Sequence, residues 1–268
     1  MRAIVKILLL SVVGVAAVGT PVFAADIVDY PAVYEEVPEI VPVEIGSGWY
    51  LRGDVSYDFE TDYKGDYTTF DDCGGTCPPT SSTLGYDEWR LEDGMNFGVG
   101  AGYQFTDYFR GDLTAHYWNH GVEGTDYRFD CGTGCGSDDS SEITAWELLA
   151  NAYVDLGTYA GFTPYIGGGL GAVHVAYDDF DSQSFNAAGD DFEPDTFAGE
   201  ESWRFAYALM AGVSYDLTQS VKLDVGYRYV DVDEGEMFGE NALGGVTGGD
   251  DEGFDRHTIQ AGVRYSLF

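Results

Sequence analysis

Large apolar residues alternate with polar residues along seven stretches of this chain, and every charged residue in those stretches falls on the polar phase. In the first stretch, Leu51, Val55 and Tyr57 share one phase, whereas Arg52 and Asp54 share the other. Successive side chains of a β-strand point to opposite faces of its sheet, so each stretch has one apolar and one charged face. The pattern predicts an all-β protein whose strands have two unlike faces.

An export signal precedes the strands. Arg2 and Lys6 give residues 1–24 a basic start, an apolar run follows at 7–17, and a small-residue cleavage site stands before Ala25. An uncleaved membrane anchor is the alternative, but the run is shorter than the roughly 20 residues that a spanning helix needs. We expect a signal peptide, so insertion into a membrane must use strands.

The connections between the expected strands alternate in length, with three short turns and four long loops rich in Gly, Asp, Ser and Thr. This alternation is typical of outer-membrane barrels, whose long loops lie outside the cell. We therefore predict an eight-stranded antiparallel up-and-down transmembrane β-barrel with short periplasmic turns and four long extracellular loops. The expected strands are 49–59, 95–105, 109–118, 143–156, 164–177, 203–217, 221–230 and 256–268. The long loops are 60–94, 119–142, 178–202 and 231–255.

The fifth strand, 164–177, carries no charge, and we expect its Tyr165, Val173, Val175 and Tyr177 to face outward. The segment 25–46, ahead of the barrel at 47–268, is rich in Pro and Glu. Pro and like charges keep such a segment extended, so we expect a periplasmic linker, with a short partner-binding motif as the alternative.

The charges within the strands sum to zero, because seven basic and seven acidic residues share the phase opposite the apolar one. A charge that faces lipid near the bilayer midplane costs about 2–4 kcal/mol. An eight-stranded barrel is narrow enough for side chains to fill. We therefore predict an interior charge network that plugs the lumen, formed by Arg52, Asp54, Asp58, Arg110, Asp112, Glu147, Asp155, Arg204, Asp216, Lys222, Asp224, Arg228, Arg256 and Arg264.

The long loops are strongly acidic, with 33 acidic residues against Lys64, Arg90 and Arg128. Phosphate binding requires a surplus of Lys and Arg, so nucleic acid is excluded as a partner. We expect these acidic loops to form a solvated surface. The alternative is that divalent cations bind there and bridge to lipopolysaccharide phosphates, since hard cations take oxygen ligands. The candidate ligands, none with EF-hand spacing, are Asp190, Asp191, Glu193, Asp195, Asp250, Asp251 and Glu252.

Four cysteines form two local pairs, Cys73 with Cys77 and Cys131 with Cys135. In an exported chain an even number of cysteines suggests disulfides. We favour one small ring within each loop, and cross-linking of the two loops is the alternative. A zinc site is disfavoured, because no His lies near either pair.

No catalytic motif accompanies the histidines, so we expect neither an enzyme nor a resident cofactor. His116 should belong to the interior network and His120 to a wet loop rim. Haem ligation by His120 or His257 is the alternative reading of these side chains.

The segments 48–54, 163–171, 224–229 and 261–268 resemble the small outer-membrane β-barrels of alphaproteobacteria, the OmpA-like "porin family" proteins. The resemblance implies a monomeric, barrel-only protein in the outer-membrane lipid that supports envelope integrity or surface binding. It also implies that Phe268 is the signal for the barrel-assembly machinery, although the apolar residues of the last strand are offset from it by one. A small-solute pore is the second reading of function, and an enzyme is the third.

Overall fold

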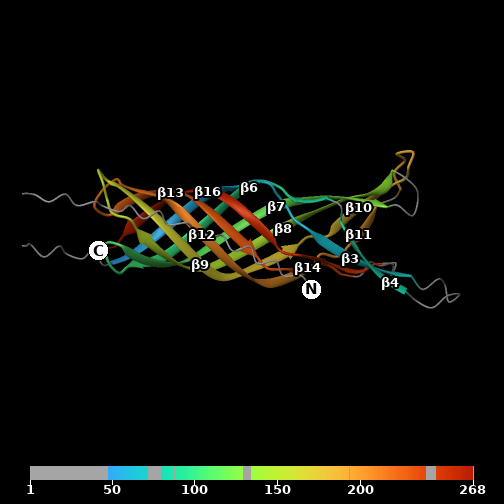
Figure 1. The fold of residues 1–268 in the computed structure, drawn as a ribbon, viewed down its shortest axis with the longest axis horizontal. Coiled ribbons are helices and arrows are strands. Elements are labelled where there is room, and N and C mark those ends of the chain that lie inside the picture. The colour runs from blue at the N-terminus through green and yellow to red at the C-terminus, as the bar shows by residue number, and fades with distance from the viewer. Residues whose placement is uncertain are drawn as a thin grey trace, which may run out of the picture. The chain divides into compact units, whose positions relative to one another are not determined.

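The computed structural model describes residues 48–71, 80–86, 88–128, 134–192, 194–239 and 246–267, all within one compact unit. Eight antiparallel strands form a closed ring, because each strand pairs with the next and the last pairs with the first (Figure 1). The predicted eight-stranded barrel is confirmed. In ring order the strands are β1 (Gly48–Asp58), β6 (Gly94–Gln104), β7 (Phe109–Arg128), β8 (Cys135–Asp155), β9 (Phe162–Tyr177), β12 (Glu201–Asp216), β13 (Val221–Val232) and β16 (Phe254–Ser266).

Three short turns lie at one end of this ring, which we call the short-turn end. Two of them have the same local chemistry: the hydroxyl of Thr106 accepts hydrogen bonds from the backbone N–H groups of Tyr108 and Phe109, and Thr218 does the same for Ser220 and Val221. Such hydroxyl bonds stabilise tight turns. The third turn contains Gly157 and Gly161, both at positive φ, where glycine carries no steric cost.

The four long segments are themselves folded, at the opposite end of the ring, which we call the long-loop end. They contain β2 (Thr61–Asp62), β3 (Gly65–Asp71), β4 (Thr80–Gly85), β5 (Glu88–Leu91), β10 (Phe180–Phe185), β11 (Asp195–Phe197), β14 (Gly235–Phe238) and β15 (Val246–Asp251). Strands β2, β5, β10 and β11 extend the barrel sheet, whereas β14, β15, β3 and β4 form a separate four-stranded sheet. Figure 1 shows β3, β4, β10 and β11 grouped beyond the barrel.

The polarity of the barrel wall inverts along β7 and β8. Toward the short-turn end, exposed Leu113 and Tyr117 alternate with buried Asp112 and His116. Beyond Tyr117 the outward phase becomes polar, with Asn119 and Glu123, while the inward phase gains Trp118 and Val122 alongside the polar His120. Strand β8 repeats the change: outward-facing Trp146 is followed, toward the long-loop end, by exposed Glu142 and Asp138. One part of the wall is therefore apolar outside, and the rest is polar outside.

The expectation for the fifth strand is wrong. Tyr165, Val173, Val175 and Tyr177 are all buried, while Ile166 and Leu170 are exposed. Pairing with β8 sets this phase, because Tyr165 lies opposite Asp155 and Val173 lies opposite Glu147. The inward glycines of β9 leave room for larger neighbours: a Cβ on Gly167 would meet the Tyr153 ring at 2.5 Å, and one on Gly169 would meet the Asn151 side chain at 2.1 Å.

Aromatic side chains flank the apolar outer band. At its short-turn side the rings of Trp49 and Tyr103 lie 5.3 Å apart, and at its other side those of Tyr117 and Trp146 lie 4.9 Å apart. Aromatic residues of membrane barrels gather at the two bilayer interfaces. Among the described residues, no helix is long and apolar enough to cross a membrane.

The outer band predicts how the barrel responds to a lipid-facing charge. Val99 is exposed on β6, between the two aromatic rims. Replacing it in Val99→Arg should lower the free energy of unfolding from lipid vesicles by about 2–4 kcal/mol, because the charge would lie near the midplane. Guanidinium titration measures this. The matched Tyr108→Arg change, in a short turn, should cost about 0–1 kcal/mol; equal losses for the two variants would contradict the placement of the band.

Candidate functional site

Twelve of the fourteen charged residues predicted for the interior are buried inside the ring. Six are arginines and six are acids, so their formal charges cancel. The other two, Asp216 and Lys222, form a half-exposed ion pair at the short-turn end. The buried twelve are Arg52, Asp54, Asp58, Arg110, Asp112, Glu147, Asp155, Arg204, Asp224, Arg228, Arg256 and Arg264.

The buried charges form connected ion pairs rather than isolated ones. Arg52 donates to both Asp54 and Asp112 at 2.9 Å, joining β1 to β7. Arg256 bridges Asp58 and Glu147, its Nη1 lying 3.1 Å from Glu147 Oε2, and Arg228 pairs with the same glutamate. Once charges are buried, removal of one partner leaves the other uncompensated. The ion pairs therefore tie strands from opposite parts of the sequence together.

The two buried histidines lie beside this centre. His116 Nδ1 is 3.7 Å from Glu147, and His120 Nε2 is 3.6 Å from Asp58. His120 was expected at a wet rim, and that expectation is wrong: the residue is buried, with its ring 5.0 Å from that of Trp118. The cause is the continuation of β7 beyond the predicted strand end.

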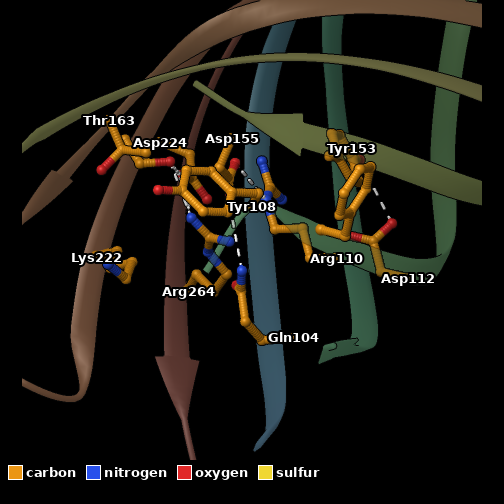
Figure 2. Close-up of polar contacts among 12 residues, drawn as sticks. Gln104, Tyr108, Arg110, Asp112, Tyr153, Asp155, Thr163, Lys222, Asp224 and Arg264 are labelled. Carbon is orange, nitrogen blue, oxygen red and sulfur yellow. Dashed lines mark hydrogen bonds and ion pairs between the residues drawn. The ribbon is translucent and has the colours of Figure 1, made fainter. Parts of the chain in front are cut away.

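A polar cavity of about 440 Å³ opens at the short-turn end. Its lining includes Lys222 and Arg264 together with Asp155. Figure 2 shows how Asp155 accepts hydrogen bonds from Arg110 at 3.1 Å and from Gln104 at 3.3 Å. The guanidinium of Arg110 also lies 3.9 Å from the Tyr153 ring centre, a cation–π distance. With both charge signs in its wall, the cavity has no strong preference for ions of one sign.

An aromatic core occupies the inside of the long-loop end. Trp89 on β5 stacks on Phe180 of β10 with ring centres 5.9 Å apart, and Phe180 contacts Phe238 of β14 at 4.8 Å. Burial raises the pKa of the Tyr63 phenol well above its usual range. The principal members of this buried cluster, which we call the aromatic core, are Tyr63, Trp89, Trp118, Tyr177, Phe180, Phe238 and Phe254. The sequence interpretation missed this core, although Trp118 and Val122 continue the inward phase of Asp112 and His116.

One buried arginine of the barrel pairs with a residue of the long-loop end. Arg204 on β12 donates to both carboxylate oxygens of Asp251 on β15, at 2.8 and 2.6 Å, and Tyr177 donates to the same group at 2.9 Å. Burial raises the pKa of Asp251, while the ion pair with Arg204 opposes that effect. Asp251 was considered as a cation ligand. In the structure it instead anchors the separate four-stranded sheet of β14, β15, β3 and β4, which we call the second sheet, to the barrel.

The other proposed cation ligands are scattered. Asp190 accepts a hydrogen bond from Asn186, and Asp191, Asp195, Asp250 and Glu252 contribute to no common site; Glu193 lies outside the described residues. In the described ranges, no three His, Cys, Asp or Glu side chains gather as metal ligands.

His257, the other haem candidate, pairs with Asp255 at 3.0 Å. Cys135 is disulfide-bonded. Cys73, Cys77, Cys131 and Phe268 lie outside the described residues, so the disulfide pairing and the assembly signal stay predictions.

A hollow of about 520 Å³ lies on the outward side of β5, β7, β8 and β10, near the aromatic core. Its wall carries five acidic residues, of which Asp139 is buried; the others are Glu88, Glu123, Asp138 and Asp181. Its one arginine, Arg90, is already paired with Glu60 at 3.2 Å. The hollow therefore has an unbalanced negative charge on an exposed sheet face.

A closed ring with an apolar outer band, aromatic rims and a buried charge network defines an outer-membrane β-barrel. The family model "Outer membrane protein beta-barrel domain" matches residues 12–266, and the chain belongs to this family. The resemblance inferred from the strand segments is confirmed.

The chain is also similar to several relatives and solved structures. An uncharacterised protein of Brucella suis biovar 1 is 36% identical over 271 residues, covering 91% of this chain and 92% of the relative. A candidate adhesin of Rickettsia felis is 24% identical, covering 84% and 90%. Among solved structures, Neisserial surface protein A is 18% identical with a TM-score of 0.40, covering 83% and 99%. OprG of Pseudomonas aeruginosa is 17% identical with a TM-score of 0.47, covering 83% and 98%.

The ion pair between Arg204 and Asp251 predicts a large effect of one substitution. In Asp251→Ala the Arg204 guanidinium stays buried without its counter-charge, which should cost about 3–5 kcal/mol. Guanidinium unfolding of the folded barrel measures the loss. The neighbouring Asp250→Ala change removes an exposed carboxylate and should be nearly neutral. A small loss for Asp251→Ala would show that the pair does not anchor the second sheet.

The aromatic core predicts a local rather than a global defect. A Cβ on Gly124 would lie 1.4 Å from the ring of Trp89, so Gly124→Val must displace that ring. We expect faster proteolysis of the long-loop end while the membrane part stays folded, since the ion pairs within the barrel are untouched. Limited proteolysis followed by gel analysis of the protected fragment tests this. Gly53→Val is the control, because a Cβ there meets nothing within 4 Å.

Proposed function

We propose that this protein is a non-enzymatic surface-binding barrel that presents its long-loop end outside the cell. The observation that carries the proposal is the folded long-loop end, with its aromatic core inside and acidic residues outside. Long loops of outer-membrane barrels face outward and short turns face the periplasm. Ordering eight additional strands at that end is costly in conformational entropy. A surface that is already ordered loses less entropy when a partner binds, so this rigidity favours binding.

The acidic outer face favours a basic partner, or a surface reached through divalent cations. Glu88, Glu123, Asp138 and Asp181 line the 520 Å³ hollow without an unpaired arginine to balance them. Complementary charge increases the rate of encounter and selects partners. The Rickettsia felis relative, described as a candidate adhesin, supports a role in attachment.

Two observations weigh against the other readings. Buried aromatic rings fill the inside of the long-loop end, where a solute pore would need an opening. The buried histidines His116 and His120 lie deep inside the ring beside Arg256, away from the exposed surfaces where a substrate could bind. We therefore favour surface binding over transport and catalysis as the function.

Attachment tests the proposal directly. The protein is produced on the surface of a non-adherent Gram-negative host, and adherence to epithelial cells is counted. Neutralising the hollow with Glu88→Gln, Glu123→Gln, Asp138→Asn and Asp181→Asn should lower adherence several-fold. The matched control removes four exposed charges elsewhere, with Asp190→Asn, Asp191→Asn, Asp233→Asn and Glu234→Gln, and should leave adherence intact.

Planar-bilayer recording of the purified barrel separates binding from transport. We expect no steady openings, because the interior is filled by paired charges and aromatic rings. Steady conductance together with unchanged adherence of the neutralised variant would contradict the proposal and favour a small-solute pore.

A further inference from the structure

The edge strand β4 is the most exposed strand of the long-loop end. All six of its residues, Thr80–Gly85, are exposed, and in the described part of the chain it pairs with β3 alone. It is attached through backbone pairing and two side-chain contacts: the hydroxyls of Thr68 and Thr83 are 3.2 Å apart, and Thr69 donates to the Ser82 carbonyl at 3.2 Å. No described strand pairs with the other edge of β4, so within the described part of the chain that edge can take a further strand.

The hydrogen-bond pattern identifies the backbone groups on that edge. The N–H of Tyr86 donates to the carbonyl of Gly65 at 3.0 Å, so these opposed residues form a hydrogen-bonded pair. In an antiparallel ladder, hydrogen-bonded and non-hydrogen-bonded pairs alternate. Ser82 and Leu84 therefore bond to β3, whereas the N–H and C=O groups of Ser81, Thr83 and Gly85 point away from it.

Strand β4 lacks the features that normally protect an edge. Natural edge strands avoid unwanted pairing with charged side chains, prolines or bulges. The sequence of β4 contains no charged residue and no proline, and its pairing with β3 runs without a register shift. An unprotected edge at the exposed end of a surface protein is a template for strand addition.

A row of carboxylates indicates the charge of the added strand. Glu236, Asp250 and Asp66 lie opposite one another on β14, β15 and β3, and the row ends at Gly85 of β4. Like charges directly opposite each other are destabilising. One oxygen of Asp66 is shielded from solvent and accepts no hydrogen bond from any described residue.

Gly85 leaves a path to this carboxylate. A Cβ on Gly85 would meet only the carbonyl oxygen of Gly65, at 3.9 Å, so the space above it is open. Adjacent strands are about 4.8 Å apart. A Lys or Arg on an added strand, opposite Gly85, could extend over the glycine toward Asp66.

From these observations we infer that β4 binds an extended, basic polypeptide segment of a partner as a fifth strand of the second sheet. The backbone groups of Ser81, Thr83 and Gly85 hold the segment, and a cationic side chain opposite Gly85 compensates the carboxylate row. The inference rests on the proposed surface-binding function, for which it names the partner's chemistry and the place of contact.

Peptide binding to the full-length barrel in lipid nanodiscs tests the inference. The probe is a short synthetic peptide that alternates Lys and Val, and its control is the same peptide with alternate backbone nitrogens methylated. Methylation keeps the charge but removes the donors of one strand edge, so affinity measured by fluorescence anisotropy should fall at least about tenfold. Equal affinity of the two peptides would mean that charge alone attracts them, and would overturn strand addition.

Two pairs of variants locate the contact. Thr83→Pro removes an outward-facing N–H that would donate to the added strand, so it should weaken binding at least about tenfold. The pairing of β4 with β3 should survive, because proline is tolerated where an edge N–H faces solvent. Thr83→Ala loses the same hydroxyl contact but keeps the N–H and should bind normally. Asp66→Asn should weaken binding several-fold, whereas Glu252→Gln, an exposed acid outside the row, should not.

These outcomes are separable from those of the attachment assay. Normal binding by Thr83→Pro, or no binding of the unmethylated peptide to the wild-type barrel, would overturn the inference even if adherence is intact. Should Thr83→Pro fail to fold, the methylated peptide on wild-type protein still decides the question. Loss of adherence in the hollow variant with unchanged peptide binding would support two separate contacts.

Discussion

The fold depends on one constraint: a bilayer offers no partner to a charge or to an unpaired backbone group. Closure of β16 against β1 pairs the backbone of the eight barrel strands, and alternation keeps the charges inside. Twelve buried charged side chains of cancelling sign follow from the same constraint, because a buried charge must find a counter-charge; most find it within the ring, and Arg204 finds it in Asp251 on β15. The bridge from Arg256 to Asp58 and Glu147 joins residues that are far apart in the sequence.

The constraint ends where the strands leave the bilayer, and the wall inverts there. On β7 the inward phase passes from Asp112 and His116 to Trp118 and Val122, while the outward phase passes from Leu113 to Glu123. Once water replaces lipid outside, the hydrophobic effect places aromatic residues inside, as in a soluble sandwich. The long-loop end is thus built on the same strands but packs like a water-soluble β-domain, with aromatic residues inside and acidic residues outside.

The alternation and the turn lengths were sufficient to predict the eight-stranded ring and the burial of charges such as Arg52 and Glu147. The phase of β9 was not predictable, because it carries no charge and its glycines make room for neighbours known only from the pairing with β8. The aromatic core was missed because the Gly- and Asp-rich segments resemble loops. Pairing of Arg204 with Asp251 depends on a contact between residues 47 apart, which no local pattern encodes.

Spin-label accessibility along β7 tests the inversion most directly. Single labels at consecutive positions from Leu113 to Thr125 are compared for collision with oxygen, which concentrates in lipid, and with a water-soluble nickel reagent. The account predicts that Leu113, Ala115 and Tyr117 favour oxygen, that Asn119, Gly121 and Glu123 favour nickel, and that the intervening inward positions are protected from both. Oxygen contact continuing at Gly121 and Glu123, or nickel access at Trp118 and Val122, would contradict it.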